Sequence, residues 1–122
     1  MSDGYHEAGL SDQASDCHRA LTSLKEEIEA VDWYNQRVDV SPNEELKAVL
    51  AHNRNEEIEH AIMILEWLRR NMPGFDEQMQ TYLFTKLPIT EVEEAMGEGE
   101  GETAPESGGD SGSGSLGIGK NL

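Results

Sequence analysis

The chain contains two long stretches in which apolar residues recur every three or four positions. In residues 46–68 this spacing places one set of side chains on a single helical face, namely Leu46, Leu50, Asn53, Glu57, His60, Ile64 and Trp67. Residues 17–38 follow the same rhythm, which predicts a helix with a narrow packing seam. The pattern therefore predicts two long amphipathic helices, and the apolar face of the second is interrupted by a carboxylate and an imidazole.

The residues that flank these stretches predict where each helix begins and ends. The first helix has Ser11 or Ser15 as its candidate N-cap and should end near Asp39. Ser41, Pro42 and Glu44 match a capping box with proline at the first helical position, so the second helix should begin at about Pro42. Because so short a connection leaves no room for another arrangement, the two helices should form an antiparallel hairpin.

Shorter elements are expected after the hairpin. Residues 72–74, Met-Pro-Gly, should stop the second helix after Asn71. A short helix is predicted at about residues 75–85, and Pro88 should introduce one or two further turns ending at Met96. The expected fold class is therefore all-α, an antiparallel two-helix hairpin plus a short C-terminal helix, with residues 1–10 unstructured and residues 11–96 as the folded domain.

The composition changes abruptly after the predicted domain. Residues 97–113 are rich in Gly, Glu and Ser, which predicts a flexible acidic linker. Residues 114–122 then contain an apolar island, made up of Leu116, Gly117, Ile118 and Gly119 and followed by the terminal Leu122. In an extended strand Leu116 and Ile118 would share one side, as a peptide that fills two neighbouring pockets requires. The tail is predicted to be a docking peptide, and the alternative is a tail without function.

The formal net charge of −16 in 122 residues limits the classes of partner. Such a field repels nucleic-acid phosphates and attracts cations. Residues 1–10 lack a basic and an apolar signal region, and the longest apolar run, residues 61–65, is too short to span a bilayer. We therefore expect a cytoplasmic protein with no nucleic-acid or membrane partner, in which the lone Cys17 is a packing residue rather than a reactive thiol.

The acidic and imidazole residues of the two helices match half of a metal site. Carboxylate-bridged di-iron bundles take one Glu from each of two helices and a Glu-x-x-His pair from each of two others. Here the second helix supplies Glu57 and His60, and the first supplies a single Glu at position 27 or a neighbouring position. Ligands of this kind suit iron or manganese, with zinc as a competitor.

Dimerisation would complete both the site and the fold. A two-helix hairpin cannot bury an apolar seam by itself, and half a site holds a metal pair poorly. Two-fold pairing into a ferritin-like four-helix bundle would meet both needs, with Glu27, Glu57 and His60 from each chain around two ions. The simpler interpretation of Glu-x-x-His in so acidic a chain is a solvated helix face.

Several neighbouring residues admit both a functional and a simpler interpretation. Glu26 and Glu29 are either a solvated face or a funnel for cations. Trp33 and Tyr34 fit packing roles, although the Tyr34 hydroxyl could hydrogen-bond to a metal ligand. His52 lies one turn before Glu56 and is expected to pair with it on the surface.

Four segments and the tail together resemble one known family, the encapsulated ferritins, which are ferritin-like cargo proteins of encapsulin nanocompartments. The segments are residues 26–34 (EEIEAVDWY), 52–60 (HNRNEEIEH), 65–70 (LEWLRR) and 81–85 (TYLFT). Residues 114–119 (GSLGIG) are similar to the encapsulin targeting peptide, although the terminal residues 120–122 (KNL) stand where the family pattern has Ser-Leu.

The resemblance implies a ferroxidase, which oxidises Fe(II) to Fe(III) with O2 for mineralisation and storage inside the shell. By position it assigns Glu27, Glu57 and His60 as iron ligands at a di-iron centre, with calcium, manganese or zinc as alternative occupants. It further assigns roles near that centre, with Glu26, Glu29 and Trp33 where metal enters and Tyr34 beside the ligands. It also implies a homodimer that assembles into a ring of ten chains within an encapsulin shell. The rival functions are a metal-buffering or structural cargo protein and a rubrerythrin-like peroxidase.

Overall fold

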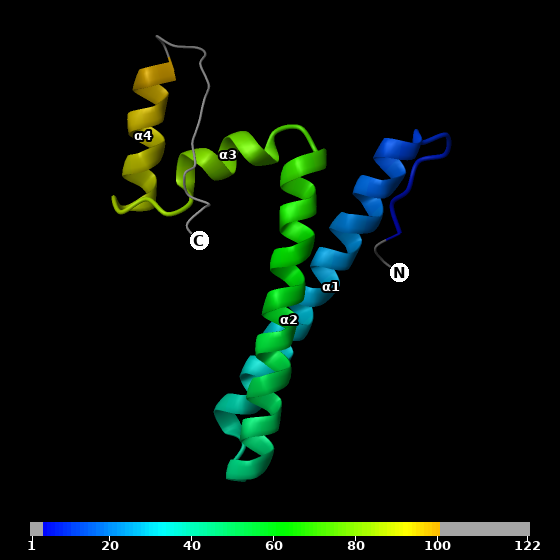
Figure 1. Ribbon diagram of the computed structural model, residues 1–122, viewed down its shortest axis with the longest axis vertical. Coiled ribbons are helices and arrows are strands. Elements are labelled where there is room, and N and C mark those ends of the chain that lie inside the picture. Colours follow the sequence, from blue (N-terminus) through cyan, green and yellow to red (C-terminus); the bar gives the residue numbers. More distant parts are fainter. Residues whose placement is uncertain (1–3, 101–122) are drawn as a thin grey trace. The chain divides into compact units, whose positions relative to one another are not determined.

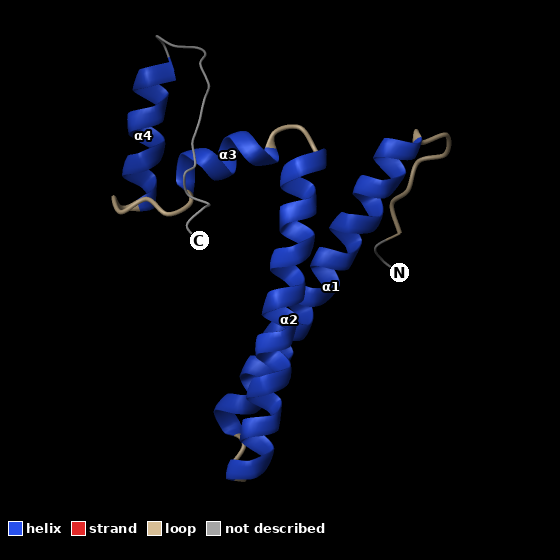
Figure 2. Cartoon of the chain, in the orientation of Figure 1, coloured by secondary structure: helices blue, strands red, loops and turns tan. Residues whose placement is uncertain are grey.

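The computed structural model describes residues 4–100, with the backbone alone for 97–100. The helices are α1 (Asp12–Val40), α2 (Glu44–Asn71), α3 (Phe75–Tyr82) and α4 (Ile89–Glu100) (Figures 1 and 2). No strand occurs within the described range, which confirms the predicted all-α class. None of these helices combines the length and the apolarity that crossing a bilayer requires. The chain forms two compact units, Met1–Asp76 and Glu77–Leu122.

The first unit is built on α1 and α2, which pack against each other as an antiparallel hairpin (Figure 1). Hydrogen bonds join the helices near both ends of the contact. The Gln13 side chain donates to the backbone carbonyl of Asn71 at 2.6 Å, and Arg54 Nη1 donates to Asn35 Oδ1 at 3.0 Å. These pairs fix the register that sets the residues between them opposite one another, and the predicted hairpin is confirmed.

The N-cap of α1 is the residue predicted from the sequence, whereas the N-cap of α2 is not. Ser11 caps α1 as predicted, because its hydroxyl accepts a hydrogen bond from the Ala14 backbone N–H at 3.1 Å. The predicted N-cap Ser41 was wrong, because its backbone N–H closes α1 on the Arg37 carbonyl. Asn43 caps α2 instead, with its side chain accepting from the Leu46 N–H at 2.9 Å.

The buried seam of the hairpin is narrower than the predicted stripe and is displaced to one side of it. Cys17 of α1 and Ala61 and Leu68 of α2 are buried, and Leu68 is fully enclosed. Leu46, which heads the predicted stripe, is 51% exposed. The face that carries His60 therefore lies at the edge of the seam in a single chain.

In the sequence that follows the hairpin, α3 is shorter than predicted. It ends at Tyr82 rather than at about residue 85. Phe84 has a φ of 64°, the left-handed conformation that ends a helix and that a non-glycine residue adopts only with some strain. Phe84 is also 89% exposed, so no packing of its side chain accounts for this conformation.

The last helix, α4, is longer than predicted. It begins at Ile89 after Pro88, as expected, but continues to Glu100 instead of ending at Met96. Val92 is its buried residue. The helix continues past Gly97 because the glutamates between the glycines have a high helix propensity. The predicted docking peptide, with Leu116, Gly117, Ile118, Gly119 and Leu122, lies outside the described residues.

An ion-pair network joins the end of α2 to the start of α3. Arg69 contacts Glu66 at 2.8 Å and Asp76 at 2.7 Å, and Arg70 contacts Glu66 at 2.7 Å. Hydrogen bonds from Arg69 and then Arg70 lower the pKa of Glu66 from 4.5 to about 2. The Arg69–Asp76 pair therefore holds the chain across the Met-Pro-Gly break, and the pairs of Arg69 and Arg70 with Glu66 persist only while Glu66 is ionised.

We expect Glu66→Gln to destabilise the first unit near neutral pH and to have a diminishing effect in acid. Because the folded pKa of Glu66 lies below its unfolded value, the stabilisation is complete above pH 4.5 and is lost as the pH falls towards about 2. Glu66 is 39% exposed, so solvent screening limits the effect to less than roughly 1 kcal/mol. Urea unfolding monitored by circular dichroism at several pH values measures it, with the exposed Glu59→Gln as control. A loss of stability that does not change with pH would contradict this assignment.

Candidate metal centre

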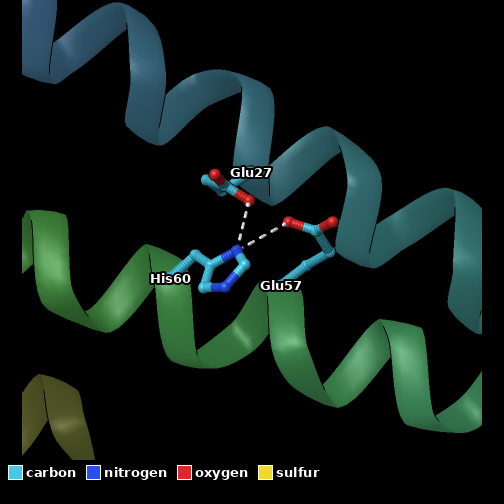
Figure 3. A group of neighbouring side chains, drawn as sticks. All are labelled: Glu27, Glu57 and His60. Carbon is cyan, nitrogen blue, oxygen red and sulfur yellow. Dashed lines mark ion pairs between the residues drawn. The ribbon is translucent and has the colours of Figure 1, made fainter.

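Three of the predicted ligands meet in the middle of the hairpin. His60 Nδ1 lies 3.4 Å from Glu57 Oε1 on the same helix and 3.7 Å from Glu27 Oε1 on α1 (Figure 3). One ligand atom from each residue can be chosen so that all three lie within 4.8 Å of one another. The i, i+3 spacing puts Glu57 and His60 on one side of α2, and the antiparallel register brings Glu27 opposite them.

The two carboxyl groups of the cluster face one another across the hairpin. Their hydrogen bond raises the pKa of Glu27, as do partial burial and the charges of Glu57 and Glu26, while His60 opposes this. Two carboxylates this close repel each other when both are ionised, so the pair favours either a shared proton or a cation. A divalent ion would replace the proton and relieve the repulsion.

Glu56 completes the surroundings of His60 on the side away from the two carboxylates. Its Oε1 lies 3.9 Å from His60 Nε2, and its Oε2 lies 3.8 Å from His52 Nε2. The surface pair of His52 with Glu56 is as predicted, whereas the contact between Glu56 and His60 was missed. Their i, i+4 spacing was the available signal. At 3.9 Å the contact of Glu56 with His60 is electrostatic rather than a hydrogen bond.

The other residues singled out from the sequence lie apart from this cluster. Glu26, Glu29 and Trp33 are exposed, and Trp33 retains 53% of its accessible surface. Their i, i+3, i+7 spacing gives them a common face of α1. Tyr34 is half-buried, with the Arg37 guanidinium carbon 5.4 Å from its ring centroid. Within residues 4–100 the Tyr34 hydroxyl has no hydrogen bond to the cluster, and the roles assigned to these four residues stay predictions.

The donor set of the cluster suits a divalent transition-metal ion. Carboxylate oxygens with one imidazole nitrogen bind iron, manganese or zinc, and two acidic ligands offset the charge of a divalent ion. Three side chains leave coordination positions open. The Glu27 and Glu57 side chains are 25% and 26% exposed, and that of His60 is 45% exposed, so the cluster is open on one side. The arrangement can therefore accept an ion and further ligands from outside the chain.

Comparison with known proteins gives relatives over most of the chain. A family model described as EncFtn-like matches residues 4–86. The chain is 57% identical over 105 residues to a protein of Thermotoga maritima named "Ferritin-like protein", which covers 84% of this chain and 92% of that one. It is 55% identical over 112 residues to the "Encapsulated ferritin-like protein" of Rhodospirillum rubrum, covering 90% of this chain and 80% of that one.

A solved structure is similar to this chain in both fold and sequence. The crystal structure of a protein from Nitrosomonas europaea superposes with a TM-score of 0.68 at 60% sequence identity. The match covers 71% of this chain and 98% of that protein's chain.

Proposed function

Because this chain belongs to the EncFtn-like family, we propose that it is a ferroxidase that oxidises Fe(II) to Fe(III) with O2 as cargo of an encapsulin compartment. The observation that carries the proposal is the cluster of Glu27, Glu57 and His60. The name of the Rhodospirillum rubrum relative supports encapsulation. Iron is here the substrate, and each Fe(II) gives up one electron to O2.

The residues of the cluster would divide the work of binding. Glu27 and Glu57 supply negative charge, which offsets the positive charge of the entering Fe(II). His60 supplies a nitrogen ligand through Nδ1, the nitrogen that faces Glu57 and Glu27. Carboxylates also bind Fe(III) firmly, so the same oxygen donors accommodate the ion after its charge has risen.

We further propose that a second copy of the chain completes the site. The helical period places Val49, Glu56 and Met63 on the same face of α2 as His60. Val49 is 51% exposed and Met63 is 63% exposed, which leaves apolar surface uncovered beside the open side of the cluster. A two-fold partner would cover this surface and bring a second set of ligands, so two ions would be held between two chains.

Placing a charge on this face is expected to prevent both assembly and catalysis. We expect Met63→Glu to shift the protein towards monomers and to lower the rate of Fe(II) oxidation, because burying an unpaired carboxylate is unfavourable. Native mass spectrometry measures the assembly, and O2 consumption after aerobic addition of Fe(II) measures the rate. The control is Ile58→Glu, which places the same charge on the opposite face of α2, where Ile58 is 42% exposed. Wild-type assembly of Met63→Glu, or monomers alone for the wild type with and without iron, would contradict the shared site.

A further inference from the structure

The N-terminal segment, residues 4–10, turns back along the first turns of α1 (Figure 1). Gly9 makes this reversal possible, because its φ of 80° lies in the left-handed region that glycine adopts without steric strain. The turn brings His6 against His18 of α1, although the two are separated by a helix cap and more than one helical turn. Two imidazoles thus meet at a place unrelated to the cluster of Glu27, Glu57 and His60.

The separation of the two rings matches that of two imidazoles on one metal ion. Their centroids are 4.9 Å apart, and their planes are inclined at 76°. A zinc-bound imidazole has its nitrogen at about 2.1 Å and hence its centroid at about 3.2 Å from the ion. For angles of about 90° to about 110° at the metal, two such centroids are about 4.5 to about 5.2 Å apart. The observed distance falls within this interval.

The imidazoles of this pair have their nitrogens free for a ligand. Both residues are exposed, and within residues 4–100 neither side chain makes an ion pair or a hydrogen bond to another group. An edge-to-face contact between two exposed polar rings contributes little by itself, since water competes for both. The net charge of −16 adds a field that attracts cations to the protein.

We propose that His6 and His18 form a second metal site, which takes one borderline divalent transition-metal ion of the zinc type through two imidazole nitrogens. Such ions prefer imidazole ligands, and water would fill the remaining positions. The site is distinct from the candidate ferroxidase cluster, because His18 precedes Glu27 by nine residues on α1, about 14 Å along the helix axis. A bound ion would fasten the N-terminal segment to α1, and this role does not depend on the proposed oxidation of iron.

Zinc titration of the full chain tests the proposal once the other cluster has been disabled. In a Glu57→Ala background we expect one Zn²⁺ per chain by isothermal titration calorimetry, with the imidazole ¹⁵N resonances of His6 and His18 shifting together. Adding either His6→Ala or His18→Ala should weaken this binding at least roughly tenfold, because a chelate loses one of its two ligands. Replacing both should weaken it little further than replacing one.

The matched control is His52→Ala in the same background, because His52 is an exposed histidine outside the pair. This variant should bind zinc as the background does. Equal binding by the His6→Ala, His18→Ala and His52→Ala variants would overturn the proposal, and so would the absence of any zinc binding in the Glu57→Ala background. Circular dichroism checks that helicity is unchanged, as expected for exposed side chains.

Discussion

Replacing Glu57 by alanine is expected to slow O2-dependent Fe(II) oxidation by at least roughly 10- to 100-fold. Removing a side chain that merely hydrogen-bonds to a metal ligand already costs this much, and Glu57 is proposed as a ligand itself. Glu57 has this effect because it takes part in two of the three contacts of the cluster. It lies 3.4 Å from His60 Nδ1 and shares the hydrogen bond that raises the pKa of Glu27. The rate is measured by O2 consumption and by the absorbance of Fe(III) after aerobic addition of Fe(II).

Glu27→Ala and His60→Ala should lower the rate to a similar extent, because each removes one member of the same cluster. The control is Glu59→Ala, which removes an exposed carboxylate two residues from Glu57 on another face of α2. This variant should oxidise iron at the wild-type rate. Unchanged rates in all three cluster variants would exclude the assignment of the site.

The same assay separates the two rival functions. A metal-buffering or structural cargo protein would bind iron stoichiometrically without consuming O2. A rubrerythrin-like peroxidase would turn over faster with H2O2 than with O2. All three functions could use the same ligands, so a variant that loses metal binding does not distinguish them. The comparison of turnover with O2 and with H2O2 does.

Deleting residues 116–122 is expected to abolish packaging into an encapsulin shell and to leave iron oxidation intact. The apolar Leu116 and Ile118 follow an acidic linker and have the alternation of a peptide that fills two pockets. Their burial is the main source of affinity available to so short a segment. Co-expression with a shell protein, followed by purification of the shells and measurement of their cargo content, tests the expectation.

The control deletes a segment of the same length from the linker, residues 101–107, which carries acidic and small residues. That variant should be packaged normally, since it keeps the proposed docking peptide intact. The Leu116→Ser and Ile118→Ser double variant should behave like the deletion. Normal packaging without residues 116–122 would contradict the role of the tail. A further variant replaces Asn121-Leu122 by Ser-Leu, the ending of the family pattern. If this variant is packaged less well than the wild type, the natural ending does not weaken docking.

Local sequence patterns were sufficient to predict the helices but less so their ends. The recurrence of apolar residues gave both long helices, because that spacing is a direct consequence of the helical period. At the connection, Ser41 and Asn43 were competing caps, and a capping box alone could not show that Ser41 would close the preceding helix. At α3, nothing in the sequence signalled that Phe84 would adopt a left-handed conformation usually left to glycine.

Some features of the candidate cluster follow from local sequence, and others depend on the tertiary structure. The sequence by itself determined that Glu57 and His60 share a helix face, because i, i+3 spacing is a property of one helix. It left the partner on the first helix at Glu27 or a neighbour until the resemblance to a family assigned Glu27. The antiparallel packing of α1 on α2 brings Glu27 to 3.7 Å from His60 and leaves Glu26 and Glu29 exposed, which makes Glu27 the carboxylate of α1 that lies in the cluster. Register between helices depends on contacts such as that of Asn35 with Arg54, which lie far apart in the sequence and become neighbours only on folding.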